Sequence, residues 1–224
     1  MQVMEAWTVH WLAASGSLDD YRPAITDALR IAYDALSSHI KPPQLDILVQ
    51  RQGGGTIPEL GISGRAHRPQ LFAIGCDPGN PHFANSLTNG ALTRTIIHEA
   101  HHCLRMNGPG YGRTLGEALV SEGLAGRFVR HILQSPPEPW EAAAALPALK
   151  SLRIGKMTLS QAGYDHAKWF FGKGALPRWL GYSLGYEIVG QWLDATEGSE
   201  PDWINVRAEI PIQIAIERGL IASN

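Results

Sequence analysis

The pentapeptide His98-Glu99-Ala100-His101-His102 carries the residue types of a zinc site with a proton acceptor beside it. His98 and His102 are four residues apart, so on a helix they lie one turn apart on the same face. Two imidazoles presented in this way can bind one Zn²⁺, with Zn–N distances of about 2.0–2.1 Å. Glu99 is placed to take a proton from a metal-bound water instead of binding the metal. The pattern predicts one zinc ion per chain; a core helix that carries histidines is the alternative.

The third histidine of this stretch is expected to have a different role. His101 lies about 100° from His102 around the helix axis, so it should not reach the same metal. We expect His101 either to support the metal ligands without binding the metal or to lie at the surface.

A third protein ligand is expected from a second helix, because Thr114 to Ala125 also reads as helical. Thr114 and Glu117 form a Thr-x-x-Glu capping box, which gives Glu117 a structural role at the helix start. Glu122 lies among apolar residues, where an unpaired carboxylate would be costly to bury and a metal would remove that cost. We therefore expect Glu122, in preference to Glu117, as the third ligand, with water in the fourth position.

The order His-Glu-x-x-His, a loop and Glu122-Gly-Leu-Ala125 resembles the gluzincin peptidases. More closely, the chain resembles a bacterial family catalogued as a domain of unknown function and described as predicted zinc-dependent proteases. The segments that carry this resemblance are 95–102, 117–125, 169–172 and 181–189. It implies a zinc metallopeptidase, either an endopeptidase or an aminopeptidase, in which Glu99 is the general base. The departure is Gly126, which stands four residues after Glu122 where thermolysin-like enzymes have an aspartate. The carboxylate that orients a zinc histidine must then come from elsewhere or be absent.

Two tyrosines one helical turn apart are candidates for stabilising the oxyanion of the reaction. Tyr182 and Tyr186 share a face of a helix expected from Pro177 to about Leu193, where they could also pack at the edge of the core. Tyr182-Ser-Leu-Gly185 resembles the Tyr-x-x-Gly segment of zinc aminopeptidases, which favours Tyr182 as the catalytic residue. Tyr186 and His166 are the alternatives, and with Glu117 they are candidates for contacts with the ligands or the substrate.

The elements around these motifs predict an α+β fold. Strands are expected at 7–12, 45–50, 60–67 and 71–75, with a helix at 17–38 between the first two. Residues 1–107 would form a small twisted β-sheet with helices over the zinc-binding helix, and residues 108–224 a mostly helical part that carries Glu122. Further helices are expected at 140–149 and 160–171. The zincin-like layout that the gluzincin resemblance implies makes the strand from about Gly61 to Ala66 the edge that binds a substrate peptide; an interior strand is the alternative.

Composition narrows the class of protein. The chain has 224 residues, 44% of them hydrophobic, and a net charge of −2 without a basic tract, which argues against a nucleic-acid partner. No apolar run approaches the roughly 20 residues of a membrane span, and the start of the chain lacks the features of a secretory signal. Cys76 and Cys103 are expected to be buried thiols in a reducing cytoplasm. The expected partner is a peptide or protein substrate, and no feature specifies an oligomeric state.

Two other functions fit the same residues. One is a non-catalytic, zinc-containing peptide-binding protein, although a purely structural site would not need Glu99. The other is a zinc hydrolase that acts on a non-peptide bond.

Overall fold

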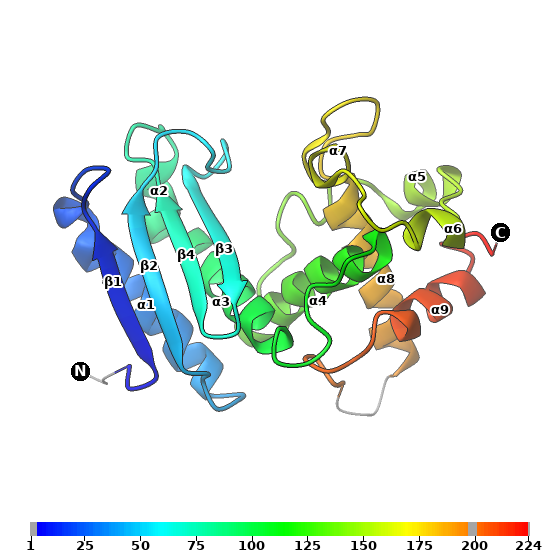
Figure 1. Ribbon diagram of the computed structural model, residues 1–224, viewed down its shortest axis with the longest axis horizontal. Coiled ribbons are helices and arrows are strands. Elements are labelled where there is room, and N and C mark those ends of the chain that lie inside the picture. Colours follow the sequence, from blue (N-terminus) through cyan, green and yellow to red (C-terminus); the bar gives the residue numbers. More distant parts are fainter. Residues whose placement is uncertain (1–3, 197–200, 224) are drawn as a thin grey trace. The chain divides into compact units, whose positions relative to one another are not determined.

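The computed structural model describes residues 4–196 and 201–223 (Figure 1). The chain divides into two compact units, Met1–Asn107 and Gly108–Asn224. The fold class is α+β, as predicted, because the first unit contains a four-stranded sheet and the regular elements described in the second are helices. Among the described helices, none combines the length and the apolar character needed to cross a bilayer.

The sheet of the first unit is formed by β1 (Trp7–Leu12), β2 (Leu45–Arg51), β3 (Ile62–Arg68) and β4 (Leu71–Cys76), in the order β1-β2-β4-β3. β1, β2 and β4 are parallel, and β3 pairs antiparallel with β4 at the edge of the sheet. The strand expected to be an edge is therefore an edge, and the interior alternative is wrong. One face of β2 is buried through Leu45, Ile47 and Val49, which is the alternation expected of a half-buried strand.

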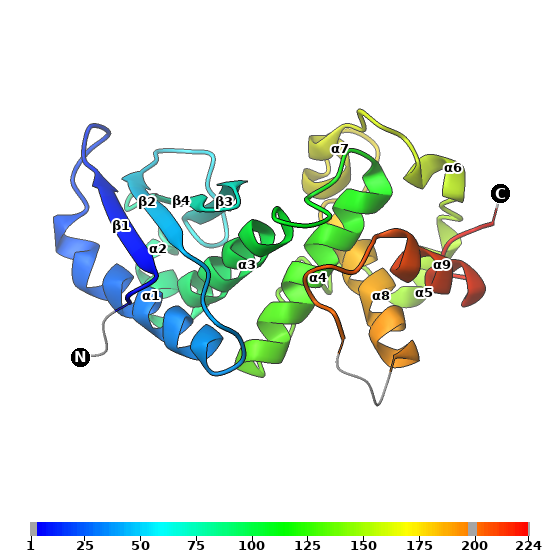
Figure 2. The same cartoon turned by 60° about the horizontal axis from the view of Figure 1, so that its bottom comes forward.

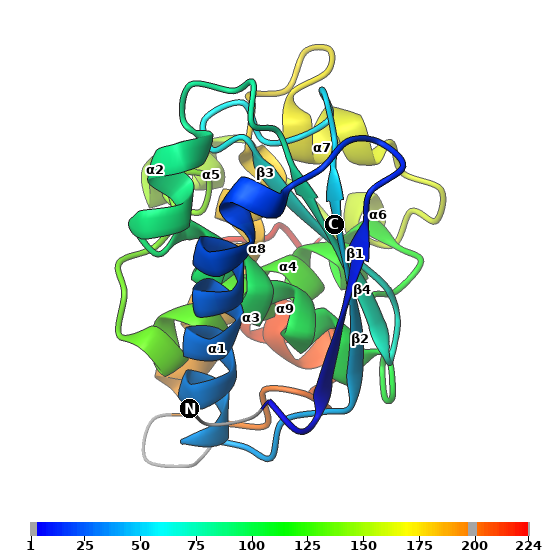
Figure 3. The ribbon, with the colours of Figure 1, turned by 90° about the vertical axis from the view of Figure 1, so that its left-hand side faces the viewer.

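Three helices accompany this sheet: α1 (Arg22–Ser37), α2 (Phe83–Thr88) and α3 (Ala91–Arg105). Figure 3 shows them on one face of the sheet, with α3 in contact with β3, β4 and α1. α1 begins five residues later than predicted, after a 3₁₀ turn at Asp19–Tyr21, with Pro23 in its first turn, a position that proline favours. α2 was not predicted.

The second unit is built on α4 (Leu115–Leu133) and α8 (Leu180–Ala195), which pack against each other and against α9 (Glu209–Glu217) (Figure 2). The two long helices meet at glycines: a Cβ on Gly123 would overlap the carbonyl of Gly185, and a Cβ on Gly185 would overlap that of Leu119. Gly185 therefore allows a close approach of the two helices.

Two predicted helices of this unit are wrong in extent. In place of the helix predicted at 140–149, the chain forms the short α5 (Leu146–Ser151). Of the helix predicted at 160–171, the second half forms α7 (His166–Phe171), and α6 (Lys156–Leu159) ends just before that range. Gly163, with φ of +74°, separates α6 from α7, whose N-cap Asp165 accepts a hydrogen bond from Lys168 N at 3.0 Å. α8 begins at Leu180, three residues after Pro177.

Candidate metal centre

Helix α3 presents the two histidines of the motif toward one point. Its N-cap is Gly90, and its apolar side buries Leu92, Ile96 and Ala100. The Nε2 atoms of His98 and His102 are 3.0 Å apart, and the two rings meet edge to face with centroids 4.6 Å apart. Two nitrogens bound to one tetrahedral zinc ion would be about 3.3 Å apart, given the usual Zn–N distances. The pair therefore fits a shared metal with little adjustment.

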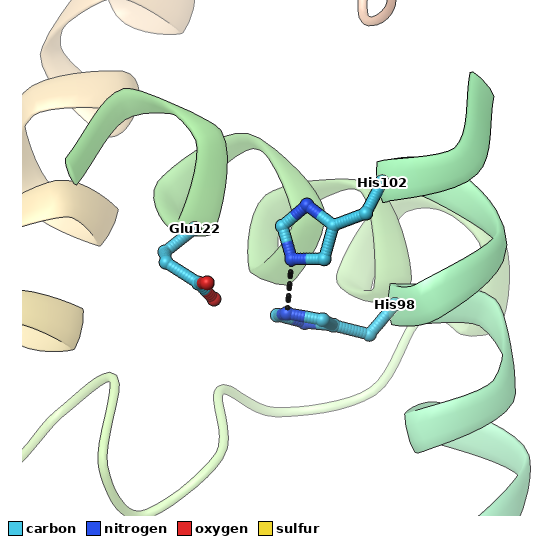
Figure 4. Close-up of side chains that lie close together, drawn as sticks. All are labelled: His98, His102 and Glu122. Atoms are coloured by element: carbon cyan, nitrogen blue, oxygen red, sulfur yellow. Dashed lines mark hydrogen bonds between the residues drawn. The ribbon is translucent and has the colours of Figure 1, made fainter. Parts of the chain in front are cut away.

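Glu122 completes the set of donors. His98, His102 and Glu122 each offer one ligand atom, and these atoms lie within 4.8 Å of one another (Figure 4). His102 and Glu122 are buried, at 5% and 8% exposure, and His98 is half-buried. Two imidazole nitrogens and one carboxylate oxygen are a donor set that zinc accepts.

Glu99 is held by the sheet of its own unit. Its Oε2 accepts a hydrogen bond from Ala66 N of β3 at 2.7 Å, and the side chain is 7% exposed. Gly64 of the same strand lies against it, since a Cβ at position 64 would be 2.5 Å from Glu99 Oε1. One oxygen of this carboxylate therefore has a main-chain donor, and a glycine leaves the space that the side chain occupies. His101, next but one along the helix, is fully buried, which excludes the surface alternative.

Glu117 caps the helix that carries Glu122, as the Thr-x-x-Glu pattern predicts. Its Oε2 accepts hydrogen bonds from the backbone N–H groups of Arg113 and Thr114, both at 2.8 Å, and Glu117 N donates to Thr114 Oγ1. The N–H groups of Thr114 and Arg113 lower the pKa of Glu117 below its ordinary 4.5. Glu117 is not part of the group that could hold a metal.

Tyr111 is the residue near these donors that the sequence did not indicate. Its hydroxyl donates a hydrogen bond to Glu122 Oε1 at 2.7 Å. Burial raises the pKa of Tyr111 well above its ordinary 10.0, and the charge of Glu122 raises it further, so the phenol keeps its proton and remains a donor. The only sign in the sequence is its place between Gly110 and Gly112, directly before the capping box.

His166 lies at the start of α7 beside two other aromatic side chains. Its ring stacks on Phe170 with centroids 4.4 Å apart, and its Nδ1 is 3.5 Å from the hydroxyl of Tyr164. Burial lowers the pKa of His166 below 6.5, while the charges of Glu122 and Asp165 oppose the shift. A neutral imidazole at neutral pH follows from this balance.

The two candidate tyrosines of α8 have different surroundings. Tyr182 is half-buried and meets Phe170, on which His166 stacks, edge to face with ring centroids 5.0 Å apart. Tyr186 is 7% exposed, and its ring lies under the guanidinium of Arg127, with Cζ 3.7 Å from the ring centroid. The Tyr186 hydroxyl has no hydrogen-bond partner among the described residues. Tyr182, therefore, lies with the groups around Glu122, and Tyr186 packs against Arg127.

A buried carboxylate occupies the space beside Gly126. A Cβ on Gly126 would overlap Oε1 of Glu141, whose Oε2 accepts a hydrogen bond from Glu138 N at 2.7 Å. Glu141 is 7% exposed, and Gly126 follows Glu122 by one turn of α4. The position that lacks the expected aspartate thus has a glutamate from another segment next to it.

Comparison with known proteins gives one family and one relative. The family described as "Predicted Zn-dependent protease (DUF2268)" matches residues 26–213. The uncharacterized protein YjaZ of Bacillus subtilis (strain 168) is 27% identical over 155 residues, which are 66% of this chain and 56% of that protein. The chain thus spans about half the length of this curated relative. No solved structure gives a significant match.

Proposed function

The chain belongs to the predicted Zn-dependent protease family (DUF2268), and from this premise we propose that it is a metallopeptidase that hydrolyses peptide bonds through a zinc-activated water. The observation that supports this most is the convergence of one atom each from His98, His102 and Glu122 within 4.8 Å. Glu99, adjacent to His98 in the chain, supports catalysis over a purely structural site, because such a site needs no proton acceptor.

In this proposal His98, His102 and Glu122 would hold the zinc, and a water molecule would be activated there. Bound zinc supplies Lewis acidity that brings the pKa of the water down to about 7. Glu141, packed beside Gly126, provides a carboxylate next to the position at which the thermolysin-like pattern has its aspartate.

Glu99 would be the general base. With Oε2 engaged by Ala66 N, its Oε1 is the atom proposed to take the proton of the attacking water. The same carboxyl then delivers that proton to the nitrogen of the leaving amine, so that the peptide C–N bond breaks as an acid and an amine form. The half-buried Tyr182 is proposed to donate to the oxyanion that develops; Tyr186 and His166 are the alternatives.

The substrate peptide is proposed to bind along β3. β3 is an edge strand, and the main-chain groups of its outer side that are not already bonded to Glu99 or Ile57 can pair with an added strand. The Ala66 N–H group that bonds Glu99 also belongs to β3. The backbone of β3 would therefore position both the bound peptide and the general base Glu99.

The test is hydrolysis of a peptide library by the zinc-loaded protein, with products identified by mass spectrometry. Internal fragments would indicate an endopeptidase, and stepwise loss from free N-termini an aminopeptidase. The control is Glu99→Gln, which should bind zinc and lose cleavage by about 10²–10⁴-fold, since an amide cannot take the proton. A loaded parent protein that cleaves no peptide would overturn the proposal.

A further inference from the structure

We propose that Tyr111 is a positioning residue of the metal centre: its hydroxyl holds one oxygen of Glu122, so that the other oxygen is the one presented to the metal. This inference rests on the zinc site of the proposed function. It assigns a role to a residue outside the His-Glu-x-x-His and Glu122 segments.

The contact is a direct hydrogen bond to a proposed ligand. Tyr111 O–H donates to Glu122 Oε1 at 2.7 Å, within the range of a charge-assisted bond. A carboxylate can turn about its last side-chain bond and bind a metal through either oxygen or both. A donor fixed on Oε1 stops that rotation and leaves Oε2 as the single metal-binding oxygen.

The loop that carries Tyr111 is shaped by the glycines on both sides of it. Gly110 and Gly112 have φ of +77° and +95°, in the left-handed region that residues with a side chain rarely adopt. A Cβ at Gly112 would also overlap the side chain of Glu117. These two conformations bring the chain back toward α4, so that Tyr111 reaches a residue 11 positions later.

Glu117 fixes this loop to the helix. Its Oε2 accepts from Arg113 N, from Thr114 N, and from Thr114 Oγ1 at 2.9 Å. Arg113 is two residues after Tyr111, so the capping box fixes the end of the loop as well as the start of α4. Glu117 therefore acts on Glu122 through Tyr111, not as a metal ligand.

The experiment compares zinc affinity and stability in Tyr111→Phe, which removes only the hydroxyl. The dissociation constant for zinc, measured by competition with a chromophoric chelator, should rise roughly 10–100-fold. The Tm of the zinc-free variant should stay close to that of the parent protein. Tyr33→Phe is the matched control, because Tyr33 packs edge to face on Trp7, with ring centroids 5.1 Å apart, and should leave zinc affinity unchanged.

A second variant keeps the inference testable if Tyr111→Phe does not fold. Glu117→Gln should weaken zinc binding by a smaller factor, because the loop is held less firmly. Combining it with Tyr111→Phe should add nothing further, since both changes act through one hydrogen bond. Equal zinc affinity in Tyr111→Phe and the parent, or independent effects of the two substitutions, would overturn the inference.

The zinc measurements also separate this inference from the proposed function. A parent protein that binds zinc but cleaves no peptide, with weaker zinc binding in Tyr111→Phe, supports the role of Tyr111 and overturns the peptidase. A parent protein that binds no zinc overturns both.

Discussion

Glu99 Oε2 accepts the backbone N–H of Ala66 at 2.7 Å, so the proposed general base is fixed to the edge strand of the sheet. The donor is a main-chain group and cannot be removed by changing a side chain. Position 64 on the same strand, however, controls the space into which Glu99 extends.

Gly64→Ala is therefore expected to displace Glu99 while leaving the metal ligands unchanged. The added Cβ would be 2.5 Å from Cγ and Oε1 of Glu99. Misplacement of a catalytic group by about 1 Å can cost ~10²-fold, so kcat should fall by up to that factor with zinc content unaltered. The control is Gly53→Ala, where a Cβ meets no described atom within 4 Å. Parent-level kcat in Gly64→Ala would show that Glu99 is not the base.

The three proposed ligands predict the metal content of two variants. His102→Ala and Glu122→Gln should each hold well below one zinc per chain, because two donors no longer bind the ion firmly. Zinc can be counted by mass spectrometry after dialysis of equal amounts of protein. His39→Ala, an exposed histidine, is the control and should match the parent. Full zinc occupancy in either ligand variant would remove that residue from the centre.

Tyr182 and Tyr186 lie one turn of α8 apart, and their substitution by Phe should have different effects. If Tyr182 donates to the oxyanion, its loss should lower kcat by about 10²–10³-fold with little change in KM. The Tyr186 hydroxyl is buried without a partner among the described residues, so its removal should be neutral or slightly stabilising. Steady-state kinetics on a peptide substrate measure both. A kcat loss confined to Tyr186→Phe would transfer the role to that residue.

Cys76 and Cys103 predict a pH dependence of stability in alkaline solution. Burial raises the pKa of both thiols from 9.0 to about 12, helped at Cys103 by the charge of Glu99. Between pH 9 and 12 the folded chain keeps thiol protons that the unfolded chain loses, so the free energy of unfolding should fall as pH rises through this window. Urea titrations from pH 8 to 11 measure the slope, which should be shallower in Cys76→Ala. An unchanged slope would contradict a buried thiol at that position.

The features predicted correctly are those that depend on residues close in sequence. The one-turn spacing of His98 and His102 and the Thr114–Glu117 capping box each follow from helix geometry alone.

The features missed depend on backbone conformation or on distant partners. Tyr111 reaches Glu122 only because two glycines turn the loop, and a lone aromatic in a loop has no periodicity to reveal this. The alanine-rich stretch from Trp140 has high helix propensity, but two of its backbone groups form hydrogen bonds with the side chain of Ser183 instead of within a helix. The hydroxyl of Ser183 donates to Trp140 O at 2.9 Å and accepts from Ala144 N at 3.1 Å. Such tertiary contacts override the helix propensity of the local sequence.

The closeness of the crossing between α4 and α8 depends on main-chain contact at two glycines. At Gly123 and Gly185 the helices touch through main-chain atoms, so van der Waals contact between the backbones sets how closely they cross. Core side chains elsewhere in this unit can change in size without altering this main-chain contact. A side chain at either glycine would push the two helices apart.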